Sequence, residues 1–379
     1  MGVYVGGTLY FKDFPTDLTK TWRYTGSITN PDVEYAWLLC NGFALESVCP
    51  DFLKERLERS QRRFRAYLKS FEIGRIRLRE HCFFDLVPED FLLEFCDVKN
   101  EITKFVFENY EKPENYDHLN KIQKLLYKIK YQNVNINIEG CRKLYQSTFG
   151  RKKANEIMKR SHYIDYNLFG TITGRLTTNK NSLPILTMKK EYRQLLKPKH
   201  DWFISLDYNG AEVRTFLDLS GKEQPQDDIH EWNIKHVIKE DVDRYTAKQR
   251  FFSWLYNPDS TAIKTNFYNK EKLLDKWYDG GYIITPYKRK MQVERRKALN
   301  YLIQSTTADR VLERAVVIDK MLEDKKSFIS HIVHDEIVID LCDEERDTLP
   351  EIKKAFEKDG FMANINAGKN YLDFDRLKI

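Results

Sequence analysis

Residues 203–221, FISLDYNGAEVRTFLDLSG, constrain the fold of this chain more than any other segment. The bulky, β-favouring residues of 202–206 predict a short buried strand. Asp207 comes next, and the Asn-Gly pair at 209–210 predicts a turn. From 211 to 221 apolar residues recur at helical spacing and a glycine follows, which predicts a helix that ends there. The chain therefore contains a strand–turn–helix unit with a carboxylate at the end of its strand.

Two interpretations of Asp207 are open at this point. A carboxylate at the end of a buried strand can hold a metal ion, but an aspartate before a helix also serves as a helix cap. A second acidic site lies far downstream, where His334, Asp335 and Glu336 separate two short apolar β-runs. This pattern predicts a hairpin with acids at its tip, which by itself indicates only a solvated turn.

Length and composition favour a globular protein of two or three domains. The 379 residues are 41% hydrophobic and 13% aromatic, which excludes a disordered chain. The sequence has no apolar run of about eighteen residues for a membrane span and no signal-peptide layout at its start. The six cysteines are scattered, so we expect reduced thiols rather than a zinc site or a disulfide framework, and a cytoplasmic location.

Basic charge is concentrated in one region. The net charge of +6 is small for a chain with 63 basic residues, but residues 119–160 are strongly enriched in Lys and Arg over acids. Such an excess suits a polyphosphate partner such as nucleic acid, with a solvated helix face as the alternative. The amphipathic pattern of residues 51–160 predicts a helical domain.

Residues 1–50 form a small region of unknown role, with short apolar runs that predict strands or a small α/β unit. They include Asp32-Val33-Glu34, a D-x-E triplet of the kind found in metal-dependent exonucleases. Such triplets are frequent by chance, and no well-spaced later aspartates accompany this one. The triplet therefore indicates no exonuclease by itself.

A predicted helix over 244–256 carries four regularly spaced side chains. Arg244, Lys248, Phe252 and Tyr256 recur at four-residue spacing and therefore share one stripe. Two cations followed by two aromatics can hold a triphosphate and a base. The alternative is an ordinary amphipathic helix with exposed cations.

A long predicted helix over 294–326 carries a second polar stripe. Arg296, Asn300 and Gln304 recur at four-residue spacing, and such side chains can contact base edges in a minor groove. A solvated polar stripe is the alternative. Arg175 lies in a T-G-R-L turn, which alone is weak support for any function.

In order along the chain, these motifs resemble the polymerase core of family A DNA polymerases, the group of bacterial DNA polymerase I and several phage replicases. The series is T-G-R-L, Asp207 with Glu212, R-x3-K-x3-F-x3-Y, R-x3-N-x3-Q and H-D-E. The resemblance spans residues 161–379 and implies an α+β, right-hand polymerase fold. It implies an antiparallel-sheet palm at 161–222 and 294–379, shortened helical fingers at 223–293, and a helical thumb at 51–160.

The resemblance implies a DNA-directed DNA polymerase that adds dNTPs to a primer 3′ end by two-metal-ion nucleotidyl transfer. Asp207 and Asp335 resemble the metal-binding carboxylates, the Tyr208 carbonyl is a further ligand, and Glu336 is an auxiliary acid. Two Mg²⁺ ions are expected as cofactors, with Mn²⁺ as a substitute.

The remaining family roles concern nucleotide and DNA. Arg244 and Lys248 would grip the triphosphate, with Lys248 also protonating the leaving group as a catalytic residue. Phe252 and Tyr256 would pack against the nucleotide, and Glu212 would exclude a ribose 2′-hydroxyl. The primer-template would contact Arg175, Arg296, Asn300, Gln304 and His334.

Gly210 and Ala211 stand where relatives carry larger residues. The region before the predicted thumb is short for a 3′–5′ exonuclease domain, so we expect no proofreading in this chain. A separate exonuclease and a processivity or replisome protein are further expected partners. A minimal form of this kind resembles a phage replicase, which would act in the cytoplasm of an infected host cell.

Two alternatives are open. A single-subunit RNA polymerase shares the two aspartates and the helical stripe, although Glu212 argues against ribose. A catalytically inactive primer-template-binding module would retain the fold without the reaction.

Overall fold

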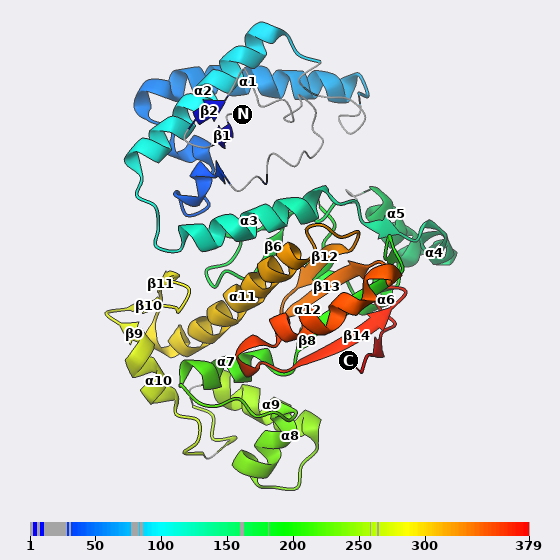
Figure 1. The fold of residues 1–379 in the computed structure, drawn as a ribbon. Coiled ribbons are helices and arrows are strands. Elements are labelled where there is room, and N and C mark those ends of the chain that lie inside the picture. The colour runs from blue at the N-terminus through cyan, green and yellow to red at the C-terminus, as the bar shows by residue number, and fades with distance from the viewer. Residues whose placement is uncertain are drawn as a thin grey trace. The chain divides into compact units, whose positions relative to one another are not determined.

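The computed structural model describes residues 3–5, 8–10, 29, 32–76, 83, 86–159, 163–180, 182–257, 259–263 and 265–378. The chain divides into two compact units, Met1–Tyr131 and Gln132–Ile379 (Figure 1). The division falls within the predicted helical segment 51–160, whose last residue, Arg160, lies outside the described residues. The helices after residue 131 therefore pack with the second unit.

The first unit combines a small sheet with three helices. Strands β1 (Val3–Val5), β2 (Thr8–Tyr10) and β3 (Val33–Glu34) pair antiparallel in the order β2-β1-β3. The predicted helices of this region are confirmed as α1 (Asp51–Ile73), α2 (Glu89–Asn109) and α3 (Tyr116–Tyr131). The apolar run between β3 and α1 forms the short 3-10 helices Ala36–Leu38 and Leu45–Val48, in which backbone groups bond locally.

Helices α1 and α2 are joined by ion pairs. Arg56 donates hydrogen bonds to Glu101 at 2.8 Å and to Asp97 at 2.6 Å, and Arg63 pairs with Asp90 at 3.0 Å. Acids of α2 therefore neutralise part of the basic charge of α1.

The second unit is built around a five-stranded antiparallel sheet in the order β12-β13-β8-β14-β15. The predicted central strand is confirmed as β8 (Trp202–Tyr208), and the predicted hairpin as β12 (Phe328–Val333) and β13 (Glu336–Leu341). Strands β14 (Ala363–Gly368) and β15 (Asp375–Arg376) complete the sheet. Strand β8 therefore lies between β13 and β14, inside the sheet.

The predicted helices of 211–221, 244–256 and 294–326 are confirmed as α7 (Ala211–Leu219), α9 (Arg244–Tyr256) and α11 (Arg295–Met321), and α12 (Leu349–Phe356) belongs to the same unit. The other helices of the unit are α4 (Ile138–Lys143), α5 (Thr148–Lys159), α6 (Lys190–Arg193), α8 (Ile229–Asn233) and α10 (Lys270–Trp277). Among the helices that the structure describes, none has the length and apolar character to cross a membrane.

Short antiparallel pairings complete the second unit. Strands β9 (Tyr278–Asp279), β10 (Tyr282–Ile284) and β11 (Lys290–Gln292) form a small antiparallel sheet with β10 in the middle. Strand β4 (Asn135–Ile136) pairs with β7 (Leu196–Lys197), and β5 (Tyr166–Asn167) with β6 (Thr177–Thr178).

Alternation along β8 places Ile204, Leu206 and Tyr208 on one face of the sheet. Ile204, Leu206 and Tyr208 are buried, and the Tyr208 ring stacks on Phe356 of α12 with centroids 4.0 Å apart. Helices α11 and α12 cover this face of the sheet (Figure 1). Because successive strand residues point to opposite faces, Asp207 faces away from these helices.

Candidate active site

The sheet brings the two predicted acidic motifs together. Asp207 lies at the end of β8 and pairs in register with Glu336 at the start of β13 and with Asn364 of β14. Asp335 is in the turn just before Glu336, next to His334, whose backbone is left-handed with φ 57°. His334 is exposed at this tip. Residues widely separated in sequence therefore meet at one end of the central strand.

The carboxylates of Asp335 and Glu336 repel that of Asp207. Burial, together with the neighbouring Asp335 and Glu336, raises the pKa of Asp207 to about 7, although Lys248 acts to lower it. A carboxyl whose neighbours share its charge gains stability from a nearby cation. This deficit of positive charge fits a metal site, since carboxylate oxygens are the ligands that hard divalent cations prefer.

Both oxygens of the Glu336 carboxylate accept hydrogen bonds. Ser205 donates a hydrogen bond to its Oε1 at 2.5 Å, and the Tyr371 hydroxyl donates to its Oε2 at 2.7 Å. Over the described residues, no group of three or more His, Cys, Asp and Glu is arranged to hold a metal ion. Both carboxylate oxygens of Glu336 therefore already accept hydrogen bonds from this chain.

The turn after Asp207 explains the two small residues that differ from the family pattern. Gly210 has φ 67°, a left-handed conformation that favours glycine. A Cβ atom at Gly210 would lie 2.4 Å from Cγ2 of Ile229. Ala211 is also buried. This chain therefore needs small residues here because α8 packs directly against the turn.

Glu212 in the first turn of α7 is the centre of a hydrogen-bonded network. Its Oε1 accepts a hydrogen bond from Arg175, and its Oε2 accepts one from the Tyr256 hydroxyl of α9. Burial raises the pKa of Tyr256, and Glu212 raises it further, whereas Arg175 and a hydrogen bond with Gln304 lower it. Residues predicted for nucleotide and for DNA contacts thus belong to one network.

The predicted stripe of α9 is present. Lys248 lies with its Nζ 5.9 Å from the ring centroid of Phe252, and the rings of Phe252 and Tyr256 stack with centroids 5.9 Å apart. Lys248 is close enough to Asp207 to lower the pKa of that carboxyl. The stripe therefore faces the acidic end of β8.

Arg244 is held by a residue that sequence reasoning missed. Its Nε and Nη2 donate to Oδ2 of Asp228 at 3.0 and 2.7 Å. Asn209, two residues after Asp207, donates to the same oxygen at 2.5 Å. Burial alone would raise the pKa of Asp228, but the hydrogen bonds from Arg244 and Asn209 hold it well below its usual range. Asp228 also caps α8, and an aspartate directly before the start of that helix is the signal that could have revealed the cap.

His230 is a second residue that the sequence reasoning missed. It is 2% exposed, and its Nε2 lies near the turn at Gly210. Burial lowers its pKa to about 4, Asp228 raises it, and Arg244 and Lys248 lower it. At neutral pH a neutral imidazole therefore lies beside the cations of α9.

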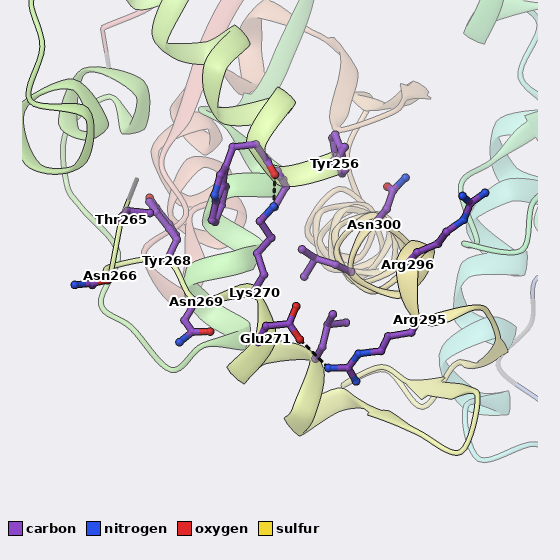
Figure 2. Close-up of a pocket in the computed structure, with 14 residues that line it drawn as sticks. Tyr256, Thr265, Asn266, Tyr268, Asn269, Lys270, Glu271, Arg295, Arg296 and Asn300 are labelled. Atoms are coloured by element: carbon purple, nitrogen blue, oxygen red, sulfur yellow. Dashed lines mark hydrogen bonds and ion pairs between the residues drawn. The ribbon is translucent and has the colours of Figure 1, made fainter. Parts of the chain in front are cut away.

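Arg296 and Asn300 of α11 line a pocket of about 810 Å³ together with Tyr256 and residues of α10 (Figure 2). Lys270 of α10 donates to the carbonyl of Trp254 near the end of α9. Gln304, one turn further along α11, bonds Tyr256 instead. The polar stripe of α11 thus runs from an open pocket to the Glu212 network.

Comparison with known proteins defines a class of fold. No family model matches the sequence, and no curated protein does. Solved structures do match, and they show that this chain has a fold similar to a polymerase domain. One of them is the POL domain of Pol1 from M. smegmatis in complex with DNA primer-template and dNTP, at 11% identity and a TM-score of 0.54. The match covers 74% of this chain and 76% of that one.

Proposed function

We propose that this protein is a template-directed DNA polymerase that extends a primer 3′ end with dNTPs. The observation that carries the proposal is the meeting of Asp207 and Asp335 with the cationic stripe of α9 at one end of β8. The fold similar to a polymerase domain supports it. In this proposal the five-stranded sheet with α7, α11 and α12 serves as the palm, residues 223–293 as the fingers, and the helices of 51–160 as the thumb.

Asp207, Asp335 and the carbonyl of Tyr208 would hold two Mg²⁺ ions, with Mn²⁺ as a substitute. When bound, such ions lower the pKa of the primer 3′-hydroxyl and neutralise charge on the pyrophosphate leaving group. Asp207, Asp335 and Glu336 would supply the negative charge at this end of β8 that attracts the ions. Glu336 stays aside because Ser205 and Tyr371 occupy its oxygens.

Arg244 and Lys248 bind the triphosphate in this proposal. The Arg244 side chain is 47% exposed while it pairs with Asp228, so a phosphate can approach it without first opening a buried site. Lys248 follows Arg244 by one turn of α9 and is near enough to Asp207 to lower its pKa, so in this proposal it donates a proton to the departing pyrophosphate. Both cations supply positive charge at the position where negative charge develops.

Glu212 selects the sugar. Arg175 and Tyr256 each hold one of its carboxylate oxygens, so the carboxylate cannot easily swing away from a ribose 2′-hydroxyl. Phe252 and Tyr256 present stacked rings to the nucleotide. This arrangement favours a DNA polymerase over a single-subunit RNA polymerase.

Primer-template DNA is the proposed macromolecular partner. Arg296 and Asn300 would contact the template strand from their pocket, which has room for a nucleotide. Arg175, Gln304 and His334 would contact the primer terminus. The exposed Arg142, Lys143, Arg151 and Lys152 of α4 and α5 provide positive charge for the phosphates of the duplex.

The testing experiment is a primer-extension assay with wild type and Asp207→Ala side by side. We expect the wild type to extend with dNTPs in Mg²⁺, and Asp207→Ala to lose extension while it still binds primer-template, because the lost carboxylate acts in the transition state. Asp201→Ala, just before the opposite end of β8, is the matched control and should extend normally. Faster extension with rNTPs would identify an RNA polymerase. Binding of primer-template by wild type without extension in Mg²⁺ or Mn²⁺ would identify an inactive binding module.

A further inference from the structure

A buried ion pair lies directly beneath the T-G-R turn. Arg289 precedes β11 and is 8% exposed, and Asp309 of α11 is fully buried. The Nε of Arg289 donates to Oδ2 of Asp309 at 3.0 Å, and its Nη2 donates to Oδ1 at 2.7 Å. Burial alone would lower the pKa of Arg289, but Asp309 raises it. The Arg289 guanidinium therefore stays charged, and its two hydrogen bonds to Asp309 form a bidentate geometry that fixes the plane of the guanidinium.

The loop that carries Arg289 is attached to α11 at a second point. The Tyr287 hydroxyl donates to Oε2 of Glu313 at 3.1 Å, one helical turn after Asp309. Within the loop, the Thr285 amide donates to the Arg289 carbonyl at 3.0 Å, and the Arg289 amide donates to the Thr285 hydroxyl at 3.3 Å. The position of the Arg289 guanidinium is therefore set by α11.

The T-G-R turn rests on this guanidinium. Gly174 has φ 75°, and a Cβ atom there would lie 2.5 Å from both Cζ and Nη2 of Arg289. The Gly174 amide donates to the Thr171 carbonyl at 3.3 Å, and the Thr171 hydroxyl donates to the Arg175 carbonyl at 2.9 Å. The backbone of the turn thus lies in contact with the ion pair, without room for a side chain.

Arg175 leaves this turn and reaches Glu212, which also receives Tyr256. A continuous series of contacts therefore connects α11, through Arg289 and the turn, to the acid proposed to select the sugar. A small displacement of the turn would lengthen the bond between Arg175 and Glu212. Since Glu212 is only 16% exposed, water cannot easily replace the lost donor.

We propose that Arg289 and Asp309 are positioning residues for sugar selection: their bidentate pair holds the Gly174–Arg175 turn where Arg175 can restrain Glu212. This inference rests on the proposed polymerase function. A bidentate charged pair suits the task because it sets distance and orientation together, whereas an apolar pair of similar volume fills the space without specifying either.

The first test is the double variant Arg289→Met with Asp309→Leu. Replacing a buried ion pair by apolar side chains of similar volume commonly preserves stability, so we expect an unchanged circular dichroism spectrum and urea midpoint. The preference for dNTP over rNTP should fall about tenfold, the effect of loosening one charged hydrogen bond. KM for dNTP should rise more than kcat falls, because Glu212, which Arg175 restrains, is proposed to contact the sugar rather than the reacting phosphate.

Arg289→Lys provides a second test that keeps the charge. A lysine cannot reproduce the fork geometry, so the dNTP preference should fall in this variant too. Asp218→Asn is the matched control. Asp218 of α7 pairs with Arg310 of α11, and Arg310 also donates to Asp359 at 3.0 Å. This ion pair therefore joins α11 to α7 and not to the T-G-R turn. Its sugar preference should equal that of wild type.

The outcomes separate this inference from the proposed function. A wild type that extends no primer refutes the polymerase function itself. Suppose instead that wild type prefers dNTP and that the double variant Arg289→Met/Asp309→Leu folds. If that variant keeps the wild-type preference within about twofold, only the positioning role is refuted. If the double variant does not fold, unchanged preference in Arg289→Lys refutes it. An equal loss in Asp218→Asn would show general loosening of α11 and also overturn the inference.

Discussion

Gly210→Ala is the substitution whose effect follows most directly from the structure. Gly210 joins the end of β8 at Asp207 to α7 with φ 67°, and a Cβ atom added to it would lie only 2.4 Å from Cγ2 of Ile229. Gly221, after α7, has nearly the same conformation at φ 66°, but no atom lies within 4 Å of the position that its Cβ would take. The two alanine variants therefore share the backbone cost and differ in the clash.

The magnitudes can be estimated separately. An L-residue in the left-handed region costs about 1–2 kcal/mol, partly offset by about 0.4–1 kcal/mol because alanine restricts the unfolded chain. Gly221→Ala should therefore lower the free energy of unfolding by about 1 kcal/mol. Overpacking adds about 1–3 kcal/mol at Gly210, since Ile229 is fully buried and cannot move freely. Gly210→Ala should therefore lower the free energy of unfolding by about 2–4 kcal/mol.

The assay is urea unfolding of wild type and both variants under identical conditions, combined with primer extension. Ile229 follows Asp228, which holds Arg244, so a displaced α8 should also raise KM for dNTP in Gly210→Ala. Gly221→Ala should leave KM unchanged.

A double-mutant cycle with Ile229→Ala gives the decisive comparison. Ile229→Ala alone should destabilise by about 2–5 kcal/mol because it leaves a cavity. In the double variant the new Cβ occupies part of that cavity, so the loss should be smaller than the sum of the two single losses by about 1–3 kcal/mol. Equal destabilisation by Gly210→Ala and Gly221→Ala, or strict additivity with Ile229→Ala, would refute the proposed clash.

Three further predictions concern sugar, pH and salt. Glu212→Ala should raise rNTP incorporation relative to dNTP by about tenfold or more in competitive extension, and an unchanged ratio would contradict its role. Burial lowers the pKa of His331 to about 3, so folding favours the neutral ring. The stability that depends on the neutral His331 ring is complete above the unfolded pKa near 6.5 and is lost as pH falls toward 3. In urea unfolding across this window, the free energy of unfolding of wild type should fall by up to about 1.4 kcal/mol per pH unit more than that of His331→Leu. Parallel plots of unfolding free energy against pH for the two proteins would exclude the effect. Affinity for primer-template should fall with salt at a logarithmic slope of about −0.9 per neutralised phosphate, and a flat response would indicate that the basic helices are only solvated.

Local patterns predict most elements of the second unit. The strand before Asp207, the helix that carries Arg244 to Tyr256, and the hairpin around Asp335 each follow from residues adjacent in sequence and are present as β8, α9 and the β12–β13 pair. Periodicity and turn residues act over a few positions, so they need no knowledge of the tertiary fold. The order of these motifs also predicts a fold of the polymerase type, which the structural comparison supports.

Tertiary structure decided which polar groups are partners. Sequence reasoning missed Asp228 and His230, because a helix N-cap aspartate and a histidine in the first turn of that helix carry no local sign of Arg244 or of Gly210. It assigned Arg175 to DNA, and gave no sign that the fold also brings Arg175 to Glu212. Pairings of this kind depend on how separate elements pack, which short-range patterns do not specify.

The strand–turn–helix unit of 203–221 shows both contributions. Its sequence alone determined a carboxylate at the end of a strand and a turn that needs glycine, because strand alternation and left-handed backbone are local properties. Only the fold placed Asp335 beside Asp207, packed Ile229 against Gly210, and surrounded Glu212 with Arg175 and Tyr256. These contacts join segments distant in sequence. Burial of the apolar sheet face against α11 and α12 fixes the positions of the strands and helices, and the polar residues at their ends are positioned with them.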